Sequence, residues 1–245
     1  MTGTTALSHR SLLLVLIALA LCSAASVGMV VLRAVYTGRG TYLFMVWNLC
    51  LAWIPLLFSL FACRSFARSS RVGVKTLAWS VLWLLFLPNA PYLVTDIQHL
   101  HVSRHSPFWF DLILLSSFSL TGLLLGYVSL YTMQEMVNRA RGAVMSWLFV
   151  LAVLGLSSFG IYLGRYLRWN SWDVLVNPTG IAIDVLERLL FPFDHPGAIG
   201  MTFFTTVMLI LPYLVLYGLT RIGRRDALQE AEGLGVSVTA SATKQ

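Results

Sequence analysis

Long runs of apolar residues, separated by short polar segments, make up most of this chain. Six of these runs are long enough to cross a bilayer as helices, because a span needs about 20 mostly apolar residues. The runs cover residues 11–32, 42–62, 76–95, 107–131, 143–164 and 197–218. The pattern predicts an all-α, polytopic membrane helix bundle over residues 1–221. A polar tail at 222–245 lacks the apolar content to pack, and we expect it to be disordered.

The third run is broken near its end by two prolines, Pro88 and Pro91. Proline has no amide hydrogen and disfavours helix at the residue before it, so carbonyls one turn earlier lose their helical partners. Inside a bilayer such groups need partners from protein or from a wet cavity. We therefore predict a discontinuous helix whose loose end lines a pocket, with an ordinary proline kink as the alternative. Asn89 and Tyr92 are the nearby side chains that we expect to supply partners.

The first run has some features of a secretory signal, since Arg10 precedes it and small residues follow Cys22. Its apolar stretch continues to Leu32, however, which is longer than the usual signal core of about 7–15 residues. We favour a retained helix over a cleaved signal.

Lysine and arginine are distributed unevenly between the two sides of the predicted bundle. With the N-terminus inside, 11 of the 17 basic residues fall in inner segments. The positive-inside rule then places both termini in the cytoplasm. It also places the ends of the third and fifth runs, and the start of the fourth, at the outer face.

The composition supports a membrane protein rather than a soluble one. Hydrophobic residues make up 58% of the chain and charged residues 11%, against about 25% charged in soluble domains. A formal charge of +7 would suggest nucleic acid as a partner in a soluble protein, but here the basic residues lie between apolar runs, so we expect no nucleic-acid partner. Cys22, Cys50 and Cys63 lack zinc-site spacing, and we expect no disulfide among them.

The first acidic residue of the chain is Asp96, directly after the broken run, with His99 and His101 close behind. Ionisable groups within a membrane are costly and usually mark function. Asp96, His99 and Asp111 are therefore candidate catalytic residues. Asp96, His99 and His101 are also a candidate metal site, although the spacing matches no common metalloenzyme motif. The alternative is that they are water-facing residues at a helix end.

Asp111 begins the fourth run, where an unpaired carboxylate facing lipid would be expensive. We predict that it pairs with Arg165 or Arg168 at the end of the fifth run. These two arginines are three residues apart, so a helix would place them on one face, suited to a phosphate or carboxylate ligand. Snorkelling to the interface is the alternative. Asn170 and Asp173 complete the candidate ligand-binding residues, together with Asn89 and Tyr92.

Two further patterns concern packing. Gly122 with Gly126, and Gly160 with Gly164, form faces on which another helix can approach closely. Residues 179–192 are too short to span a membrane and mix apolar with charged positions, which predicts an interfacial amphipathic helix that roofs the pocket.

Three strings in this chain carry a family resemblance. They are FLPNAPYLVTD at 86–96, WFDL at 109–112, and FGIYLGR at 159–165 followed by RWNSWD at 168–173. With them the chain resembles a family of bacterial integral membrane proteins known only as domain of unknown function 1361. The resemblance covers most of residues 40–220. It implies a helical protein of the bacterial inner membrane, and it brings no established activity and no catalytic residues.

The residues leave three classes of function open. The first is binding or carrying an anionic or lipid-linked envelope component in an outward-facing pocket, supported by the two arginines and the helix break. The second is a membrane-embedded hydrolase or transferase that uses Asp96 and His99, with or without a metal ion. The third is a structural or assembly subunit. We rank binding first because it needs the fewest additional assumptions.

Overall fold

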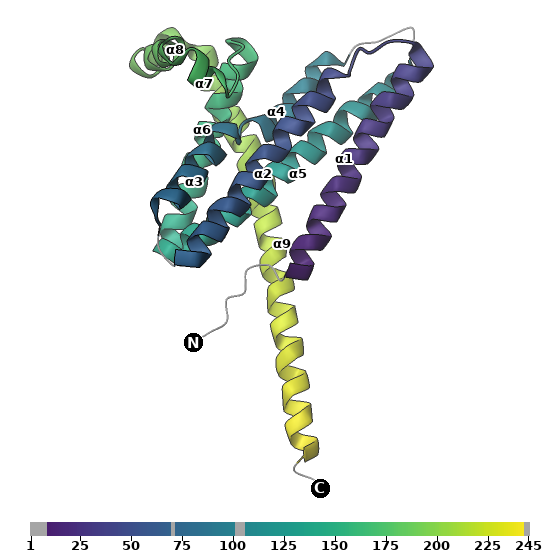
Figure 1. Ribbon diagram of the computed structural model, residues 1–245, viewed down its shortest axis with the longest axis vertical. Coiled ribbons are helices and arrows are strands. Elements are labelled where there is room, and N and C mark those ends of the chain that lie inside the picture. The colour runs from purple at the N-terminus through teal and green to yellow at the C-terminus, as the bar shows by residue number, and fades with distance from the viewer. Residues whose placement is uncertain (1–8, 70–71, 101–105, 243–245) are drawn as a thin grey trace. The chain divides into compact units, whose positions relative to one another are not determined.

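The computed structural model describes residues 9–69, 72–100 and 106–242, with side chains described over 11–223 of these. Every described element is a helix, which confirms the predicted all-α class (Figure 1). The elements are α1 (His9–Thr37), α2 (Phe44–Ser69), α3 (Val74–Phe86), α4 (Asn89–Thr95), the 3-10 turn η1 (Asp96–His99), α5 (Phe108–Arg141), α6 (Ala143–Tyr166), α7 (Asp173–Val176), α8 (Pro178–Leu190), η2 (Pro192–Asp194) and α9 (Pro196–Ala242).

Six helical segments are long and apolar enough to cross a membrane, as predicted. They are Ser11–Thr37, Phe44–Ser69, Val74–His99, Phe108–Arg141, Ala143–Tyr166 and Pro196–Gly223. Most extend beyond the predicted apolar runs, because helices continue into polar residues where the hydrocarbon layer ends. The segment predicted as an interfacial helix at 179–192 is helical over most of its length, as α8.

The chain forms two compact units, Met1–Thr206 and Val207–Gln245. The first holds the helices from α1 to α8 and the start of α9, and the second continues α9. Although the sequence predicts a disordered tail from residue 222, α9 continues as helix to Ala242. Residues 227–232 are all Ala, Leu, Gln or Glu, which favour helix even without packing.

In the first unit, α4 is held between α5 and α6 at the predicted glycine faces. A Cβ atom on Gly122 would lie 2.5 Å from the carbonyl oxygen of Ala90, and one on Gly160 would lie 2.7 Å from a ring carbon of Pro88. Gly126 and Gly164 also meet α4 residues at close range. Only residues without a side chain allow this approach, so the four glycines fix where the short helix lies.

The third span is interrupted where the sequence predicts. α3 ends at Phe86, Leu87 and Pro88 form a turn, and α4 begins at Asn89. Pro88 keeps nearly helical dihedral angles, φ −57° and ψ −27°, so the interruption lies in the hydrogen bonds. The missing proline amides prevent the regular ladder from passing through this point.

Side chains donate hydrogen bonds to two backbone carbonyls beside the break. The hydroxyl of Ser171 donates to the carbonyl of Leu85 at 3.0 Å, and the side-chain amide of Asn89 donates to the carbonyl of Phe86 at 2.9 Å. Asn89 also donates to the Ser171 hydroxyl at 2.9 Å. Asn89 bonds the carbonyl of Phe86 rather than those of Leu84 and Leu87, which the two prolines leave without a helical amide. Ser171, more than 80 residues away in sequence, is a partner that the sequence did not reveal.

Candidate functional site

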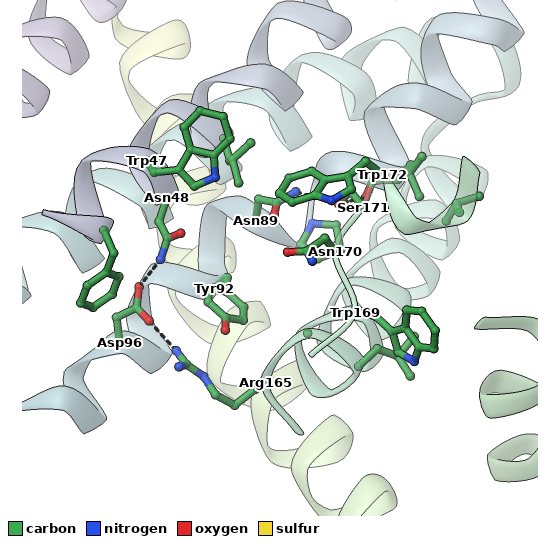
Figure 2. A pocket seen from close by; sticks show the side chains of 18 of the residues that line it. Trp47, Asn48, Asn89, Tyr92, Asp96, Arg165, Trp169, Asn170, Ser171 and Trp172 are labelled. Atoms are coloured by element: carbon green, nitrogen blue, oxygen red, sulfur yellow. Dashed lines mark hydrogen bonds and ion pairs between the residues drawn. The ribbon is translucent and has the colours of Figure 1, made fainter. Parts of the chain in front are cut away.

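A cavity of about 370 Å³ lies beside the broken helix, and we call it the Asp96 cavity (Figure 2). Its walls come from the start of α2, from α4 and η1, from the end of α6, and from the segment between α6 and α7. Polar and aromatic side chains from these four walls point toward one another in Figure 2. The lining residues with polar side chains are Asn48, Asn89, Tyr92, Asp96, His99, Arg165, Trp169, Asn170, Ser171, Trp172 and Trp47.

The buried centre of this cavity is an ion pair between Asp96 and Arg165. One Arg165 nitrogen lies 2.6 Å from Oδ1 of Asp96, and the side chains are 10% and 1% exposed respectively. The other carboxylate oxygen accepts a hydrogen bond from the amide of Asn48 at 2.9 Å. Both oxygens of Asp96 are thus occupied, as a buried charge requires.

Arg165 makes further contacts along η1 and α4. Its Nε donates to the hydroxyl of Thr95 at 3.1 Å, and Nη1 lies 3.3 Å from Nε2 of His99. The guanidinium also stacks over the ring of Tyr92, 4.4 Å from the ring centre. Tyr92 therefore lines the site as predicted, but it contacts the arginine rather than the freed carbonyls. These contacts hold the guanidinium in one position at the cavity wall.

His99 is the more accessible member of the predicted acid–histidine group. Its side chain is 41% exposed, and its Nε2 lies 3.9 Å from Oδ1 of Asp96. Because a guanidinium only donates, the contact with Arg165 requires a lone pair on Nε2, which places the ring proton on Nδ1. The ring also packs edge-on against Phe44, with centroids 5.3 Å apart.

Tryptophans form the apolar part of the cavity. Trp47 from α2 is 60% exposed and Trp172 is 36% exposed, so both offer ring surface to a ligand. Trp169 is fixed by a hydrogen bond of 2.6 Å from its indole nitrogen to Asp184 of α8. Ile181 of α8 also lines the cavity. α8 therefore contributes to this wall, as predicted for the segment at 179–192.

Asp111 is buried in an ion pair of its own, at the start of α5. Arg33 of α1 holds both of its oxygens, at 2.7 and 3.0 Å, and Ser106 donates to the carboxylate at 2.8 Å. The Arg33 guanidinium lies over the ring of Tyr42, 4.4 Å from its centre. Burial raises the pKa of the Tyr42 phenol above its ordinary value, because the phenolate would lose its hydration.

The predicted pairing of Asp111 with Arg165 or Arg168 is therefore wrong. Arg165 pairs with Asp96 instead, and the partner of Asp111 is Arg33. α5 packs against α1 as well as α6, and the first of these neighbours presents its arginine at the depth of Asp111. The sequence does contain Arg33, directly after the first run, but nothing in it indicates which helix end lies beside which.

The remaining candidates divide into cavity and surface residues. Asn170 lines the cavity, and its backbone and side-chain amides both donate to Asp173, at 2.7 and 3.1 Å. Asp173 thus positions Asn170 from outside the cavity. Arg168 is exposed and lies beyond the end of α6, with a φ of 61°. It does not share a helical face with Arg165, because the helix ends at Tyr166.

The metal hypothesis involves His101, which lies outside the described residues. Among the residues that are described, no group of three or more His, Cys, Asp or Glu side chains lies close enough to hold a metal ion. Asp96 uses both carboxylate oxygens for Arg165 and Asn48, so coordination would have to displace one of them. A metal site at Asp96, His99 and His101 stays a prediction.

Several residues of the site were not among the sequence candidates. Asn48 and Thr95 contact the Asp96–Arg165 pair, Trp47 forms a wall, and Arg33 binds Asp111. One signal for Asn48 was available, since it is the only side-chain amide in the second apolar run. A polar group in a membrane span is a functional or structural contact by default.

This fold and site define a helical membrane protein of six spans, with a polar and aromatic cavity where its third helix is broken. The chain belongs to a family described as Protein of unknown function (DUF1361), whose model matches residues 47–211. The matched part contains all the cavity residues except Phe44, and it confirms the resemblance seen in the sequence. No curated protein and no solved structure matches the chain.

Proposed function

We propose that this protein binds the polar head group of a lipid-linked envelope component in the Asp96 cavity. We further propose that the cavity faces the outer side of a bacterial cytoplasmic membrane and that both chain ends are cytoplasmic. The support for this orientation is the excess of basic residues in the segments at the other side of the bundle. The observation that carries the proposal is the combination of balanced charges, amides and tryptophan faces in one cavity.

The charge balance of the cavity favours an uncharged head group over an anionic one. Among the described residues that line it, and with His99 uncharged, Asp96 and Arg165 are the only charged ones, and they lie 2.6 Å apart. An anion would have to compete with Asp96 for the guanidinium, whose nitrogens already contact Thr95 and His99. Breaking a buried ion pair is expensive, because it leaves an uncompensated charge.

The neutral groups of the cavity suit a ligand rich in hydroxyls. Side-chain amides of Asn48, Asn89 and Asn170 line it. Their NH2 groups donate to protein acceptors, and their carbonyl oxygens are acceptors suited to ligand hydroxyls. Trp47 and Trp172 offer flat apolar faces of the kind on which the C–H face of a sugar ring packs. A volume of about 370 Å³ is within the usual range for small-molecule sites. These features together favour a sugar-like head group.

The test compares two tryptophans that are equally exposed. Trp47 lines the cavity and is 60% exposed, whereas Trp109 of α5 does not line it and is 61% exposed. Wild type, Trp47→Ala and Trp109→Ala are purified in the same mild detergent, and their bound lipids are extracted and quantified by mass spectrometry. We expect a lipid that copurifies in stoichiometric amount with wild type and with Trp109→Ala, and that is depleted in Trp47→Ala.

Two results would contradict the proposal. The same loss in both variants would mean that exposed tryptophans hold bulk lipid without a site. If wild type carries no specific lipid, the cavity has another role, and a structural or assembly function gains support. A copurifying lipid with a charged rather than a hydroxyl-rich head group would retain the binding function and reject the argument from charge balance.

The position of His99 keeps an enzymatic function as the second candidate. This ring lines the cavity and its side chain is 41% exposed, and a neutral imidazole can serve as a general base once a substrate displaces Arg165 from its Nε2. Arg165 and Asn48 each bind one carboxylate oxygen of Asp96, so this carboxylate is not available as a nucleophile. If the protein is a hydrolase or transferase, His99→Ala should copurify with an unconverted lipid that wild type lacks. Identical lipids from both proteins would reject this role for His99.

A further inference from the structure

A second cavity, of about 580 Å³, lies between the end of α2 and the start of α3, and we call it the Arg68 cavity. The two cavities lie at opposite ends of α2. Phe44, the first residue of this helix, lines the Asp96 cavity, whereas the last turns of the helix line the Arg68 cavity. The two helix ends that form it lie at the same end of the bundle in Figure 1. Its lining residues are Phe61, Arg64, Ser65, Arg68, Ser69, Gly73, Val74, Lys75 and Trp79.

Among the described residues that line the Arg68 cavity, three are cations and none is an acid. Arg64, Arg68 and Lys75 are all exposed, and none of them makes an ion pair with the described part of the chain. Arg64 and Arg68 are four residues apart on α2, a spacing at which like charges repel within a helix. The cavity therefore concentrates positive charge that the protein itself does not neutralise.

The start of α3 adds to this positive field. The helix begins after Gly73, which offers no side-chain cap, and its first turn contains no acid. The first helical hydrogen bond runs from the amide of Leu77 to the carbonyl of Gly73, so the amides before Leu77 have no helical partner. Lys75 lies in this first turn, where the helix dipole disfavours a cation. An anion in the cavity would relieve each of these costs.

The Arg68 cavity also has apolar lining residues. Phe61 and Trp79 pack together with ring centroids 5.1 Å apart, and Val74, which also lines the cavity, is 86% exposed. Both helices belong to segments long and apolar enough to cross a membrane, so lipid tails would lie close to these residues. Cationic groups next to an apolar wall match a phosphate group with hydrocarbon attached to it. Basic pockets between membrane helices bind phospholipid head groups in this way.

We propose that the Arg68 cavity binds a phosphate group, held by Arg64, Arg68 and Lys75 and by the amides at the start of α3 that have no partner within the helix. The phosphate is carried either by an anionic phospholipid or by the free ion. This site is separate from the Asp96 cavity and does not depend on the ligand proposed there.

The experiment measures the unfolding temperature of the full-length protein in a neutral detergent. Phosphatidylglycerol, phosphatidylcholine and inorganic phosphate are added separately to wild type and to two double variants. Arg68→Gln/Lys75→Gln removes two charges from the cavity. Arg139→Gln/Arg141→Gln removes two exposed charges at the end of α5, at residues that do not line the cavity. The second variant is the control for general attraction between a basic surface and an anionic lipid.

We expect phosphatidylglycerol to raise the unfolding temperature of wild type and of the Arg139/Arg141 control. The Arg68→Gln/Lys75→Gln variant should lose at least half of that rise, and phosphatidylcholine should have no effect on any of the three proteins. If inorganic phosphate reproduces the rise with the same dependence on Arg68 and Lys75, the phosphate site is supported and its ligand is the free ion. Equal losses in both double variants, or no rise in wild type with either phosphate source, would overturn the proposal.

Discussion

Replacing Arg165 with glutamine tests the centre of the Asp96 cavity most directly. The change removes the guanidinium that lies 2.6 Å from Asp96, while the carboxylate stays 1% exposed. Asn48 is then the one remaining hydrogen-bond donor to the carboxylate among the described contacts. Removing one partner of a buried ion pair costs about 3–5 kcal/mol, because the other charge is left without compensation.

The reverse change, Asp96→Asn, should cost less. Without its carboxylate partner, the guanidinium of Arg165 keeps its contacts with Thr95 and His99 and its position over the ring of Tyr92. A desolvated contact of this kind between a cation and an aromatic ring is worth about 2 kcal/mol. We therefore expect Asp96→Asn to be about 2 kcal/mol less destabilising than Arg165→Gln.

Thermal unfolding in one detergent, followed by intrinsic fluorescence, measures both changes and the double variant. For a chain of this size 1 kcal/mol corresponds to about 2–4 °C, so Arg165→Gln should lower the unfolding temperature by roughly 6–20 °C. The double variant should be less destabilised than the sum of the singles by at least about 1 kcal/mol. Arg168→Gln, at an exposed arginine outside the cavity, is the control and should stay within about 0.5 kcal/mol of wild type.

Two results would refute the reasoning about this pair. Single effects that add within about 0.5 kcal/mol would mean that Asp96 and Arg165 are not coupled. If Asp96→Asn is instead the more damaging change, the contacts with Tyr92, Thr95 and His99 do not support the guanidinium as proposed.

Three further predictions concern the rest of the first unit. Asp111→Asn should destabilise by about 3–5 kcal/mol and be less than additive with Arg33→Gln in a thermal-shift cycle, whereas strict additivity would reject the pair. Gly122→Ala should destabilise the protein by about 1–3 kcal/mol, because its new Cβ would lie 2.5 Å from a backbone oxygen of α4. Gly155 has open space around it, so Gly155→Ala is the matched control and should be neutral or stabilising. Equal unfolding temperatures for the two variants would contradict this contact. Arg168→Gly should be more stable than Arg168→Ala by about 1 kcal/mol, because glycine adopts a φ of 61° without strain; the opposite order in thermal unfolding would refute this account of the end of α6.

Much of the fold could be predicted because its causes are local. Each membrane span is defined by its own length and apolar content, whatever lies beside it. The break after Phe86 follows from proline chemistry at Pro88 and Pro91, which no neighbour can change. The faces at Gly122 and Gly160 indicated close contact because the missing side chain is itself the cause of the approach.

The site could be predicted only in part. Asp96, Asn89 and Arg165 were recognised because polar groups are rare and costly in apolar runs, and the structure places all three at one cavity. Their partners were not recognised correctly, since the strings around Asp96 and Asp111 fit an arginine from either α1 or α6. Ser171 gave no signal at all, because a serine in a polar connecting segment has many ordinary roles.

The sequence by itself determined the class of this protein: a helical membrane bundle of six spans, with a proline-broken third helix and polar groups at its end. Only the tertiary structure decided that Arg33 neutralises Asp111, that Arg165 neutralises Asp96, and that these two charges of the Asp96 cavity balance among its described lining residues. The physical reason is the distance along the chain over which each effect acts. Hydropathy, proline and glycine act within a few residues of the chain, whereas the choice of an ion-pair partner depends on which helices are neighbours and which faces they turn toward each other.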